Sequence, residues 1–136
     1  MGQTLSEPVT TKNSDSGEDE LHYFGVSSMQ GWRISMEDAH SAVLNMAPDS
    51  GRHIAWFAVY DGHGGIFVIS LGGRICWLCS FLGDRVAKYA GEHVHEIVRK
   101  QEAFDKEDYV KALQDGFVGT DTALLEGNVL RVRSED

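Results

Sequence analysis

An apolar run followed at once by a glycine-rich loop constrains this chain more than any other feature. Residues 54–59 (IAWFAV) are apolar at every position, and residues 61–65 (DGHGG) come directly after Tyr60. A short run of this kind predicts a strand that is buried on both faces. The loop then places a carboxylate, a glycine carbonyl and an imidazole at the end of that strand, where a metal site can be built.

The rest of the chain predicts strands first and helices afterwards. Runs rich in aromatic and β-branched residues predict strands over 23–29, 39–46 and 53–60. Helical spacing then predicts two helices, over 84–99 and 106–126, with Asp84 as an N-cap and Gly127 as a stop. This order favours an α+β architecture in which the helices cover a sheet.

Each helix has a stripe of apolar residues that we expect to be buried. The members in the first helix are Val86, Ala90, Val94, Ile97 and Val98, and those in the second are Val110, Leu113, Phe117 and Leu124. Trp32 and Trp56 are also expected in the core. The histidines at positions 22, 40, 53, 93 and 95 receive no functional role.

Residues 1–20 are polar and acidic and predict a flexible tail, with structure beginning near Leu21. The start of the chain matches the N-myristoylation pattern, with Gly2 as acceptor and Ser6 as the hydroxyl residue. Because Lys12 is the one cation of this tail, the expected membrane association is weak. No secretory signal is recognisable and the chain has 2 cysteines, so we expect an intracellular location, cytoplasmic or nuclear.

The overall charge limits the choice of partners. The chain has 12 Lys+Arg against 21 Asp+Glu, a net charge of −9. This balance argues against binding nucleic acid, so any recognition of phosphate must be local or must use bound cations.

Residues 66–83 fit neither the strand pattern nor the helix pattern. Arg74 near the middle disfavours a membrane span, and a buried strand or hairpin is the preferred interpretation. Cys76 and Cys79 have the spacing of a redox pair but lack the surrounding βαβ pattern. A small membrane or thiol-redox protein is therefore a distant alternative.

Three motifs, in this order, resemble the metal-dependent protein serine/threonine phosphatases of the type 2C family: GWRISMEDAH (31–40), FAVYDGHGG (57–65) and VAKYAGEH (86–93). The resemblance covers about 21–65 and 84–126 and corresponds to the N-terminal part of the family's catalytic domain. It implies a partial β-sandwich flanked by helices. Residues 66–83 then read as an insert and 127–136 as an atypical tail.

The resemblance also implies the roles of particular residues in a site for two Mg²⁺ or Mn²⁺ ions. Asp61 would bridge the ions and the carbonyl of Gly62 would bind one of them, while Glu37 and Asp38 would hold metal-bound waters or complete a coordination shell. Phosphorylated proteins would be the substrates.

Two further roles concern the phosphate itself. Arg33 would bind the phosphoryl oxygens and His63 would protonate the leaving oxygen. The family's later aspartates have no counterpart among these 136 residues. We therefore expect little phosphatase activity from the chain alone, and the alternative is a non-catalytic interaction or decoy product.

Overall fold

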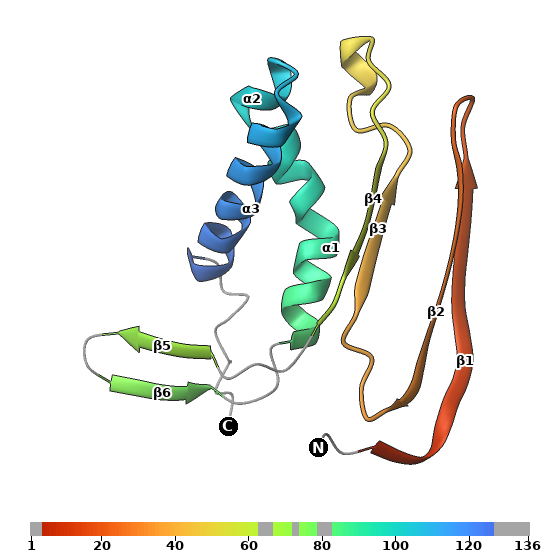
Figure 1. The fold of residues 1–136 in the computed structure, drawn as a ribbon, viewed down its shortest axis with the longest axis vertical. Coiled ribbons are helices and arrows are strands. Elements are labelled where there is room, and N and C mark those ends of the chain that lie inside the picture. The colour runs from red at the N-terminus through yellow and green to blue at the C-terminus, as the bar shows by residue number, and fades with distance from the viewer. Residues whose placement is uncertain (1–3, 63–66, 72–73, 79–82, 127–136) are drawn as a thin grey trace. The chain divides into compact units, whose positions relative to one another are not determined.

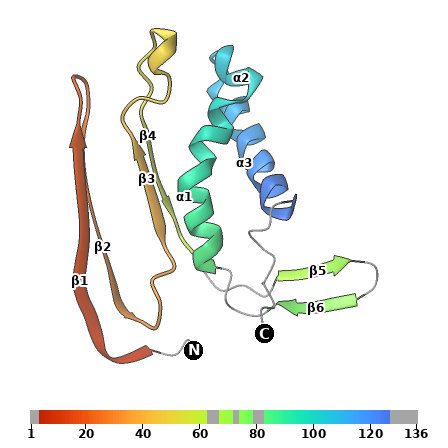
Figure 2. The ribbon, with the colours of Figure 1, turned by 180° about the vertical axis from the view of Figure 1, so that it is seen from behind.

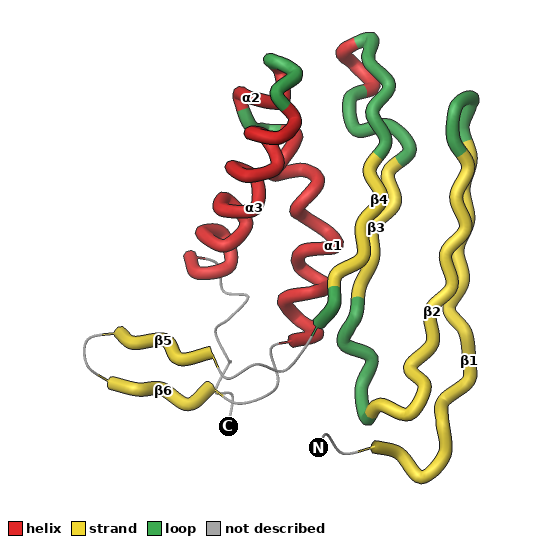
Figure 3. Tube along the Cα trace, in the orientation of Figure 1, coloured by secondary structure: helices red, strands yellow, loops and turns green. Residues whose placement is uncertain are grey.

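The structure, a computed structural model, describes residues 4–62, 67–71, 74–78 and 83–126. The chain divides into two compact units, one made of Met1–Met36 and Ala42–Phe57 and the other of Glu37–Ser41 and Ala58–Asp136. Strands dominate the first half of the chain and helices the second. Figure 3 shows the strands in yellow and the helices in red. The predicted α+β class is confirmed.

The first unit begins with a long antiparallel hairpin of β1 (Thr4–Glu18) and β2 (Tyr23–Arg33), drawn from red to orange in Figure 1. The expectation that structure begins near Leu21 is therefore wrong. β1 is polar and mostly exposed, so hydrophobic patterning gives no sign of it. Its backbone pairs with β2, and the hydroxyls of Ser14 and Ser27, which lie opposite each other, are 2.9 Å apart.

β2 alternates between partly buried and exposed side chains, as expected for a strand with one covered face. The ring of Phe24 lies 5.8 Å from the ring of Phe57, centroid to centroid. Trp32, near the end of the strand, is 56% exposed. The expectation that Trp32 belongs to the core is wrong, whereas Trp56 is partly buried.

The strands β3 (Ala39–Val43) and β4 (Trp56–Tyr60) form a second two-stranded sheet. Both are shorter than predicted, and the 3-10 turn Pro48–Ser50 lies in the connection between them. The apolar run of β4 was expected to be buried on both faces, but Phe57 and Val59 are 51% and 78% exposed. The side chains of β4 alternate between partly buried and exposed, as in a strand covered on one face. Among the described strands β4 pairs with β3 alone.

The second unit contains α1 (Gly83–Arg99), the short α2 (Glu102–Asp105) and α3 (Tyr109–Glu126), and α3 returns alongside α1 in both views of Figures 1 and 2. The predicted helix over 84–99 is confirmed. Its expected N-cap, Asp84, instead lies inside the first turn and bonds Lys88 at 3.1 Å.

The helix predicted over 106–126 begins later than expected, at Tyr109. Glu107 adopts a positive φ of 63° and interrupts the helical path after α2. Asp108 then caps α3, because its Oδ1 accepts a hydrogen bond from the backbone N–H of Lys111 at 3.1 Å. Gly127, the expected stop, lies outside the described residues.

α3 buries a different stripe from the one predicted. Its buried residues are Ala112, Gly116, Thr120 and Leu124. The expected members Val110, Leu113 and Phe117 are 68%, 38% and 50% exposed, so the prediction holds for Leu124 alone. The small residues face α1, which buries Ala87, Val94 and Val98. The helices approach closely along this stripe, and bulky side chains would hold them apart.

Part of residues 66–83 forms a third hairpin, of β5 (Phe67–Leu71) and β6 (Arg74–Leu78). The two strands are antiparallel, with Phe67 opposite Leu78 and Leu71 opposite Arg74. A hairpin is thus present where we preferred one, although Cys79 of the suggested redox pair lies outside the described residues. Within the described ranges, none of the helices is both long and apolar enough to span a membrane.

Candidate functional site

One hydrogen bond in the second unit joins two of the three sequence motifs. The backbone N–H of Gly62 donates to Oδ1 of Asp38 at 3.2 Å. Asp38 immediately precedes β3, and Gly62 comes two residues after β4. The start of β3 and the end of β4 lie close together, because the hydroxyls of Ser41 and Tyr60 are 3.4 Å apart. The sheet therefore brings the acidic pair to the glycine-rich loop.

This hydrogen bond fixes the first peptide of the loop. The N–H belongs to the peptide that joins Asp61 to Gly62, so the carboxylates of Asp38 and Asp61 are held in one region of the second unit. Both side chains are exposed, whereas Glu37 and Gly62 are partly buried. Carboxylate oxygens beside a glycine carbonyl are the hard donors that divalent cations such as Mg²⁺ and Mn²⁺ prefer.

The helix α1 supports the strand that follows the acidic pair. Gly91 is buried, and a Cβ added to it would lie 3.3 Å from the backbone oxygen of His40 and 3.5 Å from the Cβ of Ala39. A side chain at position 91 would therefore press on the strand. Glycine lets the helix pack directly against β3, immediately after Glu37 and Asp38.

Arg33 lies in the first unit, as the exposed last residue of β2. Its backbone is held by Gln30, whose Nε2 donates to the carbonyl oxygens of Arg33 and Ile34 at 2.9 and 3.0 Å. Gly31, with φ of 67°, provides the bend that Gln30 closes. His63 and Gly2 lie outside the described residues, so their roles, like those of Arg33, Glu37, Asp38, Asp61 and Gly62, stay predictions.

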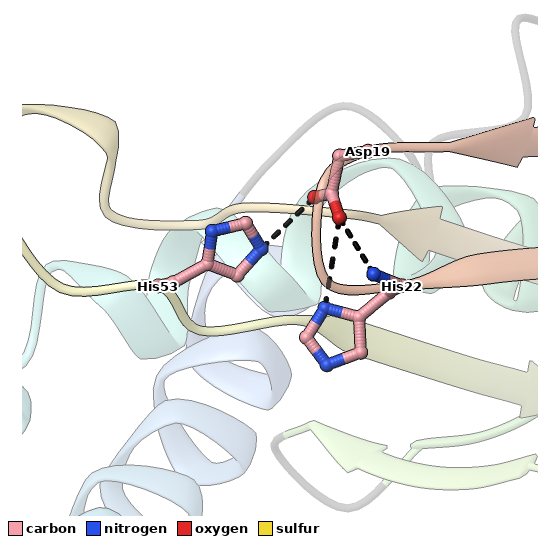
Figure 4. Close-up of side chains that lie close together, drawn as sticks. All are labelled: Asp19, His22 and His53. Atoms are coloured by element: carbon pink, nitrogen blue, oxygen red, sulfur yellow. Dashed lines mark hydrogen bonds and ion pairs between the residues drawn. The ribbon is translucent and has the colours of Figure 1, made fainter.

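A second polar cluster, which the sequence analysis did not anticipate, lies in the first unit. Asp19, His22 and His53 converge there, and Figure 4 shows both imidazoles directed toward the carboxylate. The Asp19 and His22 pair lies on the β1–β2 turn, and His53 comes from the loop before β4. An Asp-x-x-His spacing is too common to mark such a cluster, and the distant His53 gives no further signal in the sequence.

Comparison with known proteins covers residues of both regions. The family model described as protein phosphatase 2C matches residues 22–80, which include the Asp38–Gly62 pair. A protein of Aspergillus flavus named protein phosphatase 2C homolog 2 is 49% identical to this chain over 136 residues. The resemblance to protein phosphatase 2C is confirmed.

Other protein phosphatase sequences agree. Protein phosphatase 2C homolog 2 of Schizosaccharomyces pombe is 46% identical over 128 residues, and rat protein phosphatase 1G is 35% identical over 134 residues. The alignments cover 93%, 93% and 96% of this chain, for the Aspergillus, Schizosaccharomyces and rat proteins in turn. They cover 27%, 30% and 21% of those relatives, so the chain spans about a quarter of the length of these relatives.

Proposed function

We propose that this chain carries part of the active site of a metal-dependent protein serine/threonine phosphatase, which hydrolyses phosphoserine and phosphothreonine monoesters. The observation that carries the proposal is the 3.2 Å hydrogen bond from the Gly62 N–H to Asp38. It joins the two motifs that would supply the metal ligands, and relatives named as protein phosphatases share this region.

The donor set suits two hard divalent cations. Asp61 would bridge them, Gly62 would offer its carbonyl, and Glu37 and Asp38 would hold their waters or complete a coordination shell. One Asp38 oxygen already anchors the loop, and the carboxylate keeps its second oxygen for this purpose. When bound, the ions would lower the pKa of a water and neutralise the phosphoryl oxygens.

Two groups of the chain would handle the phosphate and the proton. The guanidinium of Arg33 would donate two parallel hydrogen bonds to phosphoryl oxygens, a geometry that lysine cannot reproduce. The imidazole of His63 would donate a proton to the leaving alkoxide, because histidine titrates near neutral pH. Phosphorylated proteins are the proposed substrates. We also infer an intracellular protein that associates at most weakly with membranes through a myristoylated Gly2.

The activity of these 136 residues by themselves is a separate proposal. We propose that they turn over little substrate, because the chain spans 27% of the Aspergillus relative and the resemblance implies further metal-binding aspartates beyond the matched part. The alternative is a non-catalytic interaction or decoy product. The outward side of α3 favours that reading in one respect, since Val110, Phe117, Val118 and Leu125 are all at least half exposed.

The experiment tests whether these residues can form an active site, independently of whether the 136 residues are active by themselves. In the chimera, residues 21–62 of this chain replace the matching segment of the full-length Aspergillus flavus relative. Mn²⁺-dependent hydrolysis of a phosphothreonine peptide by the chimera is measured. We expect the chimera to keep the turnover of the parent protein and to lose at least about a hundredfold with Asp61→Asn, since a bridging ligand contributes several kcal/mol.

Two results would contradict the proposal. One is an inactive chimera that is folded by circular dichroism, and the other is a chimera whose activity survives Asp61→Asn. The chain alone is measured in parallel by calorimetry with Mn²⁺. Full turnover by the chain alone, lost with Asp61→Asn, would refute the proposal that it is nearly inactive while leaving the site intact.

A further inference from the structure

We propose that Asp19, His22 and His53 form a binding site for Zn²⁺, separate from the oxygen-rich region around Asp61. All three residues belong to the first unit, and one ligand atom from each lies within 4.8 Å of the others. Figure 4 shows the two rings meeting the carboxylate from different segments of the chain. The proposal does not depend on phosphatase activity.

The β1–β2 turn holds two of the three ligands in place. The Oδ1 atom of Asp19 accepts hydrogen bonds from the backbone N–H groups of Leu21 and His22 at 2.9 and 2.7 Å. The N–H of Asp19 in turn donates to the carbonyl of His22 at 2.8 Å. This closed turn orients the carboxylate and the His22 ring before any ion arrives.

The third ligand is set by the loop between β3 and β4. His53 precedes Ile54, whose carbonyl accepts a hydrogen bond from the N–H of Met46 at 2.7 Å. Asn45 ties the same loop together, because its Oδ1 accepts the N–H of Ala47 at 2.9 Å. The loop places Nε2 of His53 at 2.9 Å from Oδ2 of Asp19.

Two of the proposed ligand atoms make no hydrogen bond within the part of the chain that the structure describes. Among the described residues, Nδ1 of His22 and Oδ2 of Asp19 are buried atoms without a hydrogen-bond partner. Nδ1 of His22 lies 3.8 Å from Oδ1 of Asp19, beyond hydrogen-bonding distance, and Nε2 of His53 is close to Oδ2 without hydrogen-bond alignment. Buried polar atoms are normally satisfied, and one cation between these atoms would satisfy both.

The donor types select the ion. Two imidazole nitrogens and one carboxylate oxygen suit Zn²⁺, whereas Mg²⁺ and Mn²⁺ favour sites made of oxygen ligands. Zn²⁺ bonds of about 2.0–2.2 Å in a tetrahedron separate the ligand atoms by about 3.4 Å, between the 2.9 Å of the closest pair here and the 4.8 Å limit of the cluster. Side-chain movements of less than about 1.5 Å would close the site, with water as a fourth ligand.

The carboxylate is in the form that a cation requires. Burial works to raise the pKa of Asp19, but the backbone hydrogen bonds from Leu21 and His22 and the neighbouring imidazoles outweigh it, so the pKa is lowered. The side chains of Asp19 and His53 are 23% and 27% exposed, which leaves an approach for the ion from solvent. The competing explanation is a histidine–aspartate ion pair that binds no metal.

The test uses the full chain with Zn²⁺ as the probe. Nitrogen-detected NMR of the histidine rings should show Zn²⁺ shifting Nδ1 of His22 and Nε2 of His53, with calorimetry giving one ion per chain at this site. Asp19→Asn, whose amide oxygen can still accept the turn's N–H groups, and His53→Gln should each weaken this binding by more than about a hundredfold, beyond the roughly 10–100-fold that loss of an outer-shell group costs.

Two control variants identify the site. Asp61→Asn and His93→Gln, which alter the loop after β4 and the α1 helix, should leave the His22 and His53 ring shifts unchanged. The proposal is overturned if Zn²⁺ moves neither ring of the unmodified chain, a measurement that needs no variant to fold. It is equally overturned if folded Asp19→Asn and His53→Gln bind Zn²⁺ as tightly as the unmodified chain.

Discussion

Gly116 of α3 lies against Val98 of α1, so closely that a Cβ added to the glycine would come within 2.9 Å of the Val98 Cα. Backbone at this distance cannot move aside without shifting a helix. The contact explains why α3 buries its small residues and exposes Phe117. Since α1 also packs on β3, the spacing of these helices bears on the strand beside the candidate site.

We therefore expect Gly116→Ala to destabilise the chain by about 1–3 kcal/mol, the usual cost of overpacking, despite the higher helix propensity of alanine. The matched control is Gly119→Ala on the same helix. Its added Cβ would meet the Cγ2 methyl of Ile97 at 3.2 Å, which is side chain rather than backbone and need shift by only a few tenths of an ångström, so the stability of this variant should stay within about 1 kcal/mol of the parent. Urea unfolding compares them, and equal losses for both variants would contradict the packing described.

A second prediction separates the two roles of Asp38. Asp38→Asn keeps an oxygen that can accept the Gly62 N–H but removes the charge, so stability should hold while Mn²⁺ affinity falls. Asp38→Ala removes both the accepting oxygen and the charge. It should therefore weaken Mn²⁺ binding and also lower the stability by about 1 kcal/mol. Calorimetry and urea unfolding measure the two effects. Parent-like Mn²⁺ binding by Asp38→Asn would show that this carboxylate has no part in holding a cation.

The bend before Arg33 yields a third prediction. Gly31 has φ of 67°, so Gly31→Ala should cost about 1–2 kcal/mol through backbone strain, even though no atom lies within 4 Å of the added Cβ. Gly25→Ala in the same strand also meets open space, but without the positive φ, and should stabilise by about 0.5 kcal/mol. Thermal unfolding of the pair provides the measurement, and matching melting temperatures would argue against strain at position 31.

The fourth prediction concerns acid. Because the pKa of Asp19 is lowered on folding, from its ordinary value of 3.8, the ionised carboxylate stabilises the folded chain above that pH. This contribution should disappear as the pH falls through the lowered folded-state pKa. Asp19→Asn should thus be less stable than the parent above pH 3.8, with the two converging in stronger acid. Urea unfolding of the parent and of Asp19→Asn at a series of pH values, with a chelator present, measures the difference in stability. If that difference persists in strong acid, the lost stability comes from packing and not from the charge of the carboxylate.

Hydrophobic patterning predicted some of these elements well and others poorly. The strands around Tyr23, Ala39 and Trp56 and the helix α1 were predicted because each has apolar residues at a regular period. β1 was missed because Thr4–Glu18 is polar, and its order depends on a partner strand rather than on burial. The stripe of α3 was assigned incorrectly because side-chain size, not hydrophobicity, decides which face can approach Val98.

Of the two polar sites, the sequence predicted the region around Asp38 and Gly62 but not the cluster of Asp19, His22 and His53. Motif order pointed to Asp38 and Gly62, which lie close together because β3 and β4 bring their ends into one place. His22 and His53 carried no such pattern. Their convergence on Asp19 depends on a turn and a loop whose shapes are set by backbone hydrogen bonds to Asp19, Asn45 and Met46.

The packing of Gly91 on His40 has a kinetic consequence. The three hairpins and the α1–α3 pair join segments that are near neighbours along the chain, so they can form early. The α1–β3 contact must instead close the whole connection from β4 to Gly83, and the entropy lost grows by about 0.6 kcal/mol for each doubling of loop length. We expect the contact between α1 and β3 to be among the last to form as the chain folds, and the rate of its formation to depend on the length of residues 66–83.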